Sequence, residues 1–163
     1  MPFTPLHMGP GITIKAVMQH RLSLMVFGWS QIVIDIQPLV MMLTGQGELH
    51  GFSHTYIGAT LIALFCGFTG KYLGEIGLKL IRGQQYQPIC WSVSFLSAFI
   101  GTYSHIVLDS IMHADIAPFA PFNRDNALQG IISIDKLHVF CVASGVVGAA
   151  LFFWIETIKR KTS

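Results

Sequence analysis

The sequence predicts an all-α membrane protein, a polytopic bundle of about four transmembrane helices that forms a single domain over residues 1–163. Hydrophobic residues make up 52% of the chain, charged residues only 11%, and the mean hydropathy is +0.58. A soluble domain carries about a quarter charged residues, so this chain cannot cover a surface that faces water. The apolar residues also gather in four stretches, and a transmembrane helix needs about 20 mostly apolar residues.

The N-terminal part of the chain precedes these four stretches. Residues Met1–Gly11 are rich in Pro and Gly, and Pro5 and Pro10 each remove a backbone donor, so no regular helix is expected throughout. A basic start followed by an apolar core and a small-residue cleavage site is missing, and we therefore expect no cleaved signal peptide. Ile12–Arg21 mixes apolar and basic residues and is expected to lie at the membrane surface or to form the polar start of the first helix.

The four predicted spans follow in order, separated by polar segments. The first contains Asp35 and Gln37, and the next residue, Pro38, predicts a bend or break nearby. The second is short by itself but can extend to Ile81 as a helix that emerges into water. The last is uncharged throughout and precedes a basic C-terminus. The predicted spans are Leu22–Leu43, His54–Thr69, Ile89–Met112 and Val139–Ile155.

Lys and Arg in the connecting segments predict the orientation, because short cytoplasmic loops are enriched in them. Basic residues precede span one, lie between spans two and three, and follow span four, whereas the other two loops hold only Arg124 and Lys136. Four spans with both termini in the cytoplasm fit this distribution, and the His- and Asp-rich helix ends then face outward. The longest loop, His113–Lys136, contains Pro118 and Pro121 and is expected to be a lid or a surface segment.

Charge and cysteine usage exclude several functions. A formal net charge of +2 without a basic, aromatic-interleaved patch argues against nucleic-acid binding. Cys66, Cys90 and Cys141 lie in different apolar segments without CxxC spacing, so they predict neither disulfides nor a thiolate metal site and are expected to be buried. Neither Ser53 nor Ser104 lies in a GxSxG elbow, which disfavours a serine hydrolase.

The strongest functional signal lies at the end of the third span. His105, Asp109 and His113 follow one another at steps of four residues, which places all three on one face of a helix. Ionisable groups within a membrane are costly and usually functional. Imidazole and carboxylate are ligands of zinc, manganese and iron, so this face is interpreted as part of a metal site. The alternative is a polar seam that joins helices by hydrogen bonds, although a seam needs fewer ionisable groups.

Other polar residues are candidates for the same site. His50 and His54 have HxxxH spacing and share a face if the second helix begins early enough to include both. Asp35 lies in the centre of the first span, where a lone carboxylate costs about 2.5–3.5 kcal/mol on insertion scales. His7 by itself reads as an ordinary interfacial histidine. The remaining candidates are expected at interfaces or in solvated loops, and they are His20, His138, Asp115, Asp125 and Asp135.

Four short motifs, taken in order, resemble a known family. They are PLH at His7, DIQP from Asp35, HGFSH from His50 and SHIVLDSIMHADIAPFAPF from Ser104. Together they make the chain similar to the bacterial inner-membrane metal-dependent hydrolases, a family that includes LexA-regulated membrane proteins, over residues from about His7 to Phe122. The resemblance implies a multi-pass protein of the bacterial inner membrane that uses a divalent metal ion, zinc foremost, with manganese and iron as alternatives.

The resemblance also implies a set of ligands. These are His7, Asp35, His50, His54, His105 and Asp109. The family pattern has a second acidic residue two positions after the first Asp, where this chain has Gln37, and an amide is the poorer ligand, which argues against a second metal ion. A single straight helix over residues 12–34 would separate His7 from Asp35 by about 33 Å. His7 can therefore be a ligand only if Ile12–Arg21 folds back as a separate short helix.

Three functions compete for these residues. A metal-dependent hydrolase near the membrane surface would use Asp109 or His113 as general base and would act on a lipid or phosphoester. A metal-ion or proton carrier would also use His and Asp, but such sites usually lie at the midplane in repeat proteins, and no repeat is visible. A non-catalytic bundle would use the same side chains to hold helices together, and no metal would copurify. Ligands that cluster toward one side favour the enzyme.

Overall fold

The structure, a computed structural model, describes residues 5–81 and 83–162, and these contain helices and no strand. The α-helices are α1 (Met8–Met18), α2 (Leu24–Ile34), α3 (Ile36–Thr44), α4 (Tyr56–Leu80), α5 (Trp91–Met112) and α6 (Ile134–Thr162). Short 3-10 turns accompany them, namely η1 (Pro5–His7), η2 (Gln19–Arg21), η3 (Phe52–His54) and η4 (Gln84–Tyr86). The predicted all-α class is confirmed.

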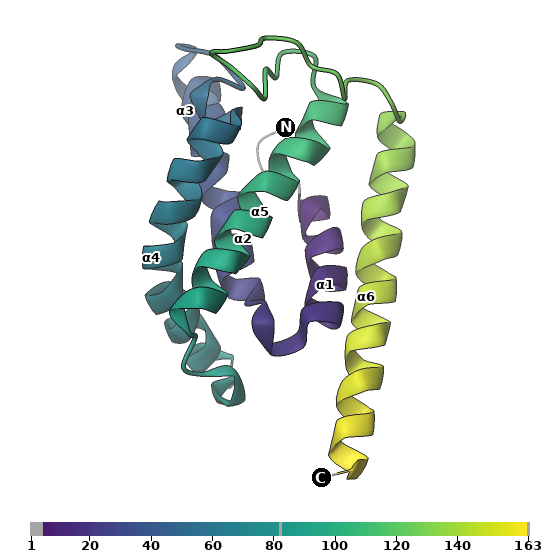
Figure 1. The fold of residues 1–163 in the computed structure, drawn as a ribbon. Coiled ribbons are helices and arrows are strands. Elements are labelled where there is room, and N and C mark those ends of the chain that lie inside the picture. The colour runs from purple at the N-terminus through teal and green to yellow at the C-terminus, as the bar shows by residue number, and fades with distance from the viewer. Residues whose placement is uncertain (1–4, 82, 163) are drawn as a thin grey trace.

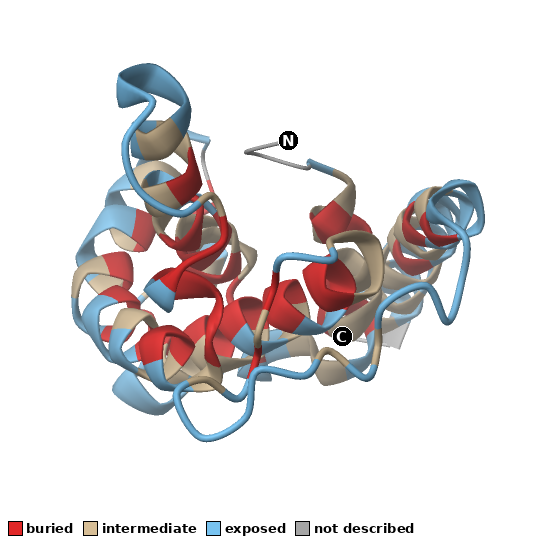
Figure 2. Ribbon diagram, turned by 90° about the horizontal axis from the view of Figure 1, so that it is seen from above, coloured by how far each residue is buried: buried red, intermediate tan, exposed pale blue. Residues whose placement is uncertain are grey.

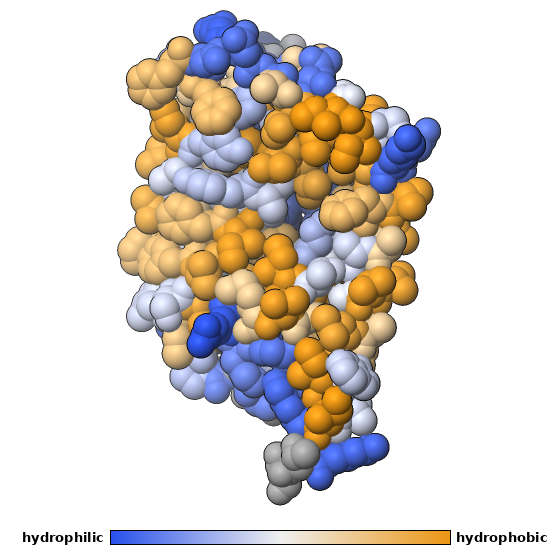
Figure 3. Space-filling view, turned by 45° about the vertical axis from the view of Figure 1, so that its right-hand side comes forward, coloured by the Kyte–Doolittle hydropathy of each residue, from blue (hydrophilic) through white to orange (hydrophobic). Residues whose placement is uncertain are grey.

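Four of the helical segments are long and apolar enough to cross a membrane. They are Leu24–Thr44, formed by α2 and α3 together, and then Tyr56–Leu80, Trp91–Met112 and Ile134–Lys161. The four run alternately up and down the bundle (Figure 1), with α2, α4 and α5 in close contact and α6 joined to them mainly through α1. In the space-filling view a broad hydrophobic belt lies between hydrophilic ends (Figure 3). The predicted bundle of four apolar spans is therefore confirmed.

The additional helix α1 is too short to span and lies inside the bundle beside α6 (Figure 1). The 3-10 turn that begins at Pro5 gives way to a regular helix only at Met8, and Pro10 lies in its first turn, where a missing N–H is tolerated. The turn η2 then reverses the chain into α2. The stretch Ile12–Arg21 is thus not the polar start of the first span but lies in α1 and η2, which fold back against it. This is the arrangement that a role of His7 as a ligand requires, and it brings His7 toward Asp35.

The first span is interrupted at Asp35, one turn before Pro38. Proline cannot donate to the carbonyl four residues back, here that of Ile34, and its ring crowds the same carbonyl. The regular helix consequently ends at Ile34 and resumes at Ile36. At the interruption the Asp35 side chain lies in the bundle interior, where the residue is only 4% exposed.

Buried residues line the inner sides of the helices when the bundle is viewed from above (Figure 2). A small cluster of Ile34, Ala59 and Ile106 joins the break in the first span to α4 and α5. By contrast α6 is largely exposed, as expected for a helix that faces lipid on most sides. Its exposed large hydrophobic residues include Val139, Phe140, Val142, Val146, Val147, Phe153 and Trp154.

The cysteines agree with the prediction at two of three positions. Cys66 and Cys141 are buried and free, whereas Cys90 is free but exposed. Cys90 is the residue immediately before α5, so it lies at the rim of the bundle and not within the span. The expectation that all three cysteines are buried is therefore wrong for Cys90.

The segment predicted to be a lid or surface segment crosses the upper end of the bundle between α5 and α6 (Figure 1). It is tied down by backbone hydrogen bonds: Tyr56 N–H donates to Pro118 at 2.8 Å, and Gly130 N–H donates to Ile111 at 3.1 Å. The Asn126 amide also donates to the carbonyls of Ser110 and His113. The segment is thus fixed to the helix ends beneath it.

The basic residues lie toward the other end of the bundle. The turn η2, the end of α4 and the C-terminal part of α6 all lie there (Figure 1), and they carry Arg21, Lys79 and Lys159–Lys161. This agrees with the charge bias used for the orientation. The start of the chain differs from the expectation, because His7 lies away from this end and the chain reaches it only at η2.

Candidate metal centre

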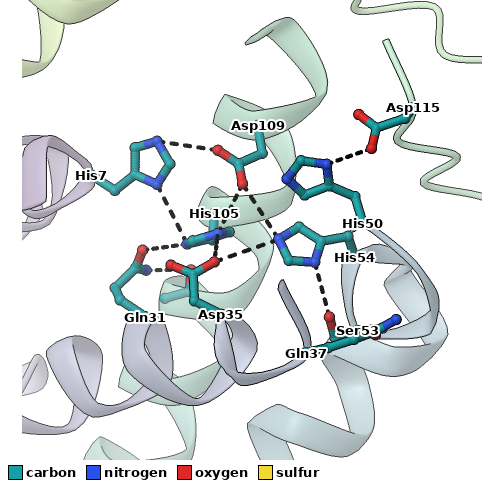
Figure 4. Close-up of polar contacts among 11 residues, drawn as sticks. His7, Gln31, Asp35, Gln37, His50, Ser53, His54, His105, Asp109 and Asp115 are labelled. Carbon is teal, nitrogen blue, oxygen red and sulfur yellow. Dashed lines mark hydrogen bonds and ion pairs between the residues drawn. The ribbon is translucent and has the colours of Figure 1, made fainter. Parts of the chain in front are cut away.

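Four buried side chains from three places in the fold converge on one point in the upper half of the bundle (Figure 4). Asp35 comes from the break between α2 and α3, His54 from η3, and His105 and Asp109 from successive turns of α5. One potential ligand atom from each lies within 4.8 Å of the others, and every one of the four residues is less than 5% exposed. This group of two imidazoles and two carboxylates could hold a metal ion.

The distances between the histidine nitrogens and the carboxylate oxygens of the group are short. His105 Nε2 lies 3.0 Å from Asp109 Oδ2 and 3.2 Å from Asp35 Oδ1, and His54 Nε2 lies 3.4 Å from Asp109 Oδ2. Nevertheless His54 Nε2, His105 Nε2 and Asp109 Oδ1 are buried without a hydrogen-bond partner. Each such group costs about 1–3 kcal/mol. The two Nε2 atoms face the carboxylates of Asp35 and Asp109, and a cation bound among them would satisfy both.

The orientation of His105 is fixed from outside the group. The amide nitrogen of Gln31 donates to the Gly101 carbonyl at 2.8 Å, so the amide oxygen is the atom that faces His105 Nδ1, also at 2.8 Å. His105 Nδ1 must then carry a proton and donate it, and in the neutral imidazole the lone pair lies on Nε2. The approach of α2 to α5 depends on Gly101, because a Cβ there would overlap the Ser30 hydroxyl.

His54 has a comparable support. Its Nδ1 lies 2.9 Å from the hydroxyl of Ser53. The Ser53 N–H in turn donates to the side-chain oxygen of Gln37 at 2.8 Å. Gln37 thus anchors the short turn that carries His54. Outer hydrogen bonds of this kind set the tautomer and ring orientation of metal-binding histidines.

A second group shares Asp109 with the first. One potential ligand atom from each of His50, Asp109 and His113 lies within 4.8 Å of the others. His50 is buried and its Nδ1 is 2.8 Å from Asp115 Oδ2, whereas His113 is half-buried and follows the last residue of α5. The rings of His50 and His113 lie side by side, with centroids 4.4 Å apart.

Burial and hydrogen bonding control the charge of this second group. Burial lowers the pKa of His50, although its hydrogen bond to Asp115 acts in the opposite direction. Burial also lowers the pKa of His113. For Asp115 burial raises the pKa, but the hydrogen bond with His50, the charges of the nearby histidines and a backbone hydrogen bond together outweigh it, and the pKa falls. The two imidazoles are therefore neutral at pH 7, as metal ligands must be.

His7 lies on the other side of Asp109. Its Nε2 is 3.4 Å from Asp109 Oδ1, and its Nδ1 is 3.4 Å from Nδ1 of His105. His7 is buried, and its Nε2 has no hydrogen-bond partner among the described residues. His7 is not a member of either of the two groups described above. It lies beside them, in contact with Asp109.

All seven candidate site residues therefore meet in one region: His7, Asp35, His50, His54, His105, Asp109 and His113. Two details differ from the expectation. The helix α5 ends at Met112, so His113 is not on the helical face of His105 and Asp109. The helix α4 begins only at Tyr56, so His50 and His54 are brought together by a turn and not by helical spacing.

The sequence did not point to three supporting residues. Gln31 and Ser53 look like ordinary polar residues of a span and a loop, and Asp115 was expected only as a surface charge. The Asp115 side chain is indeed 52% exposed, yet it is bonded to His50. The interfacial and solvated assignments agree with the exposure of His20, Asp125 and Asp135, while His138 is half-buried.

The donor set suits particular metals. Two imidazole nitrogens and two carboxylate oxygens are typical of zinc, and manganese and iron accept the same ligands. The buried Nε2 atoms of His54 and His105, which have no hydrogen-bond partner, supply an observation in favour of an ion at this place.

No family model, no curated protein and no solved structure matches the chain.

Proposed function

We propose that the protein is a metal-dependent hydrolase of the bacterial inner membrane, related to the family that its motifs resemble, and that it acts on a lipid or a lipid-linked phosphoester. The observation that carries this proposal is the convergence of Asp35, His54, His105 and Asp109, in which the Nε2 atoms of both histidines are buried without a hydrogen-bond partner. A divalent ion held there would polarise a carbonyl or phosphoryl oxygen and lower the pKa of a bound water.

A lipid substrate is supported by the access to this group. A cavity of about 430 Å³ between the start of α1 and α2 reaches Asp35 and His105. Its other lining residues, apart from the Gln31 amide, are apolar or lack a polar side chain, namely Pro5, Met8, Gly28 and Ile32. Ile32 is 44% exposed on a helix that can span a membrane. An acyl chain in this cavity would bring the attached headgroup ester to the metal.

The protein's own residues would then share the remaining work. Gln31 and Ser53 hold His105 and His54 in the orientation that leaves their Nε2 atoms free for the ion. Of the two residues considered as general base, Asp109 lies among the ligands and His113 lies at the edge of the group, beside the segment that follows α5. Either is near enough to accept a proton from a water at the centre.

A metal-ion or proton carrier is the second candidate, and the interruption of the first span at Asp35 favours it. Broken helices with ionisable residues are common in transport sites. A carrier would move the ion across sealed vesicles, whereas an enzyme would retain it. Uptake of zinc or manganese into proteoliposomes, measured with a dye inside the vesicles, would support the carrier and contradict the hydrolase.

The hydrolase is tested by metal content and turnover in the same preparation. Detergent-purified wild-type protein should hold near-stoichiometric metal by elemental mass spectrometry, and His54→Ala and Asp109→Ala should lose it. His20→Ala and Asp125→Ala are matched controls, because both residues are exposed and take no part in the cluster. The loaded protein should cleave phospholipid or phosphoester substrates, and both variants should lose that activity. Wild-type protein that stays free of metal after incubation with zinc, manganese and iron would refute the proposal.

A further inference from the structure

We infer that Asp109 bridges two divalent cations, the second of which is held by His50 and His113. This deepens the proposed function and rests on it, because the first cation occupies the group formed by Asp35, His54 and His105. The two groups of mutually close ligand atoms share no residue except Asp109. A single carboxylate common to two sets of imidazoles is the usual means of placing two metal ions side by side.

The two oxygens of Asp109 allow this division. Oδ2 lies 3.0 Å from His105 Nε2 and 3.4 Å from His54 Nε2, so it faces the first group. Oδ1 faces the His7 imidazole at 3.4 Å and is buried without a hydrogen-bond partner, which is costly for a carboxylate oxygen. One oxygen of Asp109 also lies within 4.8 Å of a potential ligand atom of both His50 and His113, so the same carboxylate is within reach of a second ion.

The second set of ligands is built in the same way as the first. The Nδ1 atom of His50 is hydrogen-bonded to Asp115 at 2.8 Å, just as Nδ1 of His105 is bonded to Gln31 and Nδ1 of His54 to Ser53. In each case the bond leaves Nε2 as the atom available to an ion. Metal-binding histidines commonly hydrogen-bond a carboxylate through the nitrogen that does not bind the metal. Such a role would explain why Asp115, although largely exposed, is hydrogen-bonded to His50.

The amide at position 37 does not argue against this second ion. Gln37 stands where the related family pattern has an acidic residue, but its oxygen accepts a hydrogen bond from the Ser53 N–H at 2.8 Å. It belongs to neither group of potential ligand atoms. The second ion therefore does not need a carboxylate at that position, since His50 and His113 supply its ligands. This assignment also makes His113 a ligand and removes it from the role of general base.

Metal stoichiometry separates this inference from the proposed function. Wild-type protein saturated with Mn²⁺ should bind two ions per chain, and His50→Ala and His113→Ala should each bind one. His138→Ala, a histidine of α6 outside both groups, should still bind two. Electron paramagnetic resonance should show an exchange-coupled pair in the wild type and an isolated ion in His113→Ala. Asp115→Asn, which leaves both ligands in place, should weaken only the second ion, by about 10- to 100-fold.

Each outcome decides a different claim. One ion in the wild type, with His113→Ala also binding one, would overturn the second site and leave the proposed hydrolase standing. Two ions without exchange coupling would overturn the bridge through Asp109. No ion in any preparation would overturn the proposed function together with this inference. Circular dichroism and gel filtration of every variant establish that the loss of an ion is not loss of the fold.

Discussion

Gln31 provides the sharpest test of how the centre is built, because it touches a proposed ligand without being one. Replacement by Met keeps the length of the side chain and removes the oxygen that accepts from His105 Nδ1 at 2.8 Å. The Gly101 carbonyl keeps a partner, since the Ser104 hydroxyl also donates to it at 3.0 Å. The loss is thus confined to one buried N–H, and it costs about 1–3 kcal/mol.

The expected effect on metal binding follows from the tautomer. Without the oxygen of Gln31, His105 is free to carry its proton on Nε2, where it blocks coordination. Loss of an outer partner typically weakens metal affinity by about 10- to 100-fold, which is about 1.4–2.7 kcal/mol. Gln31→Met should therefore show this loss when zinc is titrated against a chromophoric chelator, in detergent at pH 7.

The control is Gln129→Met, which makes the same chemical change at an exposed position outside the centre. Thermal unfolding of both variants without metal separates a loss of affinity from a loss of stability. If Gln31→Met binds zinc within twofold of the wild type, the Gln31 hydrogen bond does not set the orientation of His105 for metal binding.

Three further predictions concern the second group, the turn and the ion. Gly51→Ala should weaken metal binding at least tenfold by calorimetric titration, because its Cβ would overlap the Gln37 amide nitrogen and displace the turn that carries the histidines; an unchanged affinity would contradict this. Burial lowers the pKa of His50 and His113 in the folded state, so the unfolded chain takes up more protons as the pH falls below about 6.5. The metal-free protein should then lose thermal stability from pH 7 to pH 5, and a rise would show the opposite sign of the shift. Chelation should lower the unfolding temperature, since an ion at 100 times its Kd adds about 2.7 kcal/mol, and added zinc should restore it.

The spans were predictable because the bilayer imposes a strong and local rule. About 20 apolar residues in a row leave few alternatives to a transmembrane helix. The first and third observed spans agree with the predicted ones to within a few residues, and the second continues past Thr69 to Leu80, as its expected extension to Ile81 allowed. The ends of α6 differ more. Helix α6 begins at Ile134 and continues through the basic C-terminal residues. Charged residues end an apolar stretch, but they do not end a helix, which can continue into water. The helix is therefore longer at both ends than the span Val139–Ile155 predicted from hydropathy.

The centre was predictable in its members but not in its construction. His105 and Asp109 lie one helical turn apart, a local spacing that the sequence displays directly. His50 and His54 meet through a turn that depends on Gln37, which lies in another helix. The roles of Gln31 and Asp115 depend on contacts across 74 and 65 residues of chain. Such contacts leave no periodic signal, so the sequence pointed to the side chains that cluster and missed what orients them.

Charge balance links the centre to the kind of substrate that it would accept. Asp35 and Asp109 are buried in segments that can span a membrane, where two carboxylates cost about 5–7 kcal/mol on insertion scales. One divalent ion bound by both carboxylates and by neutral imidazoles would cancel their charge. A second ion on His50 and His113 brings only neutral ligands besides the shared carboxylate, so the centre would then carry a net charge of about +2. The partly exposed carboxylate of Asp115 compensates for a fraction of this, and the remainder would favour an anionic group. A centre with two ions should thus prefer a phosphoester to a neutral carboxylic ester of the same acyl chain, and loss of the second ion in His113→Ala should reduce that preference more than it reduces binding of the chain.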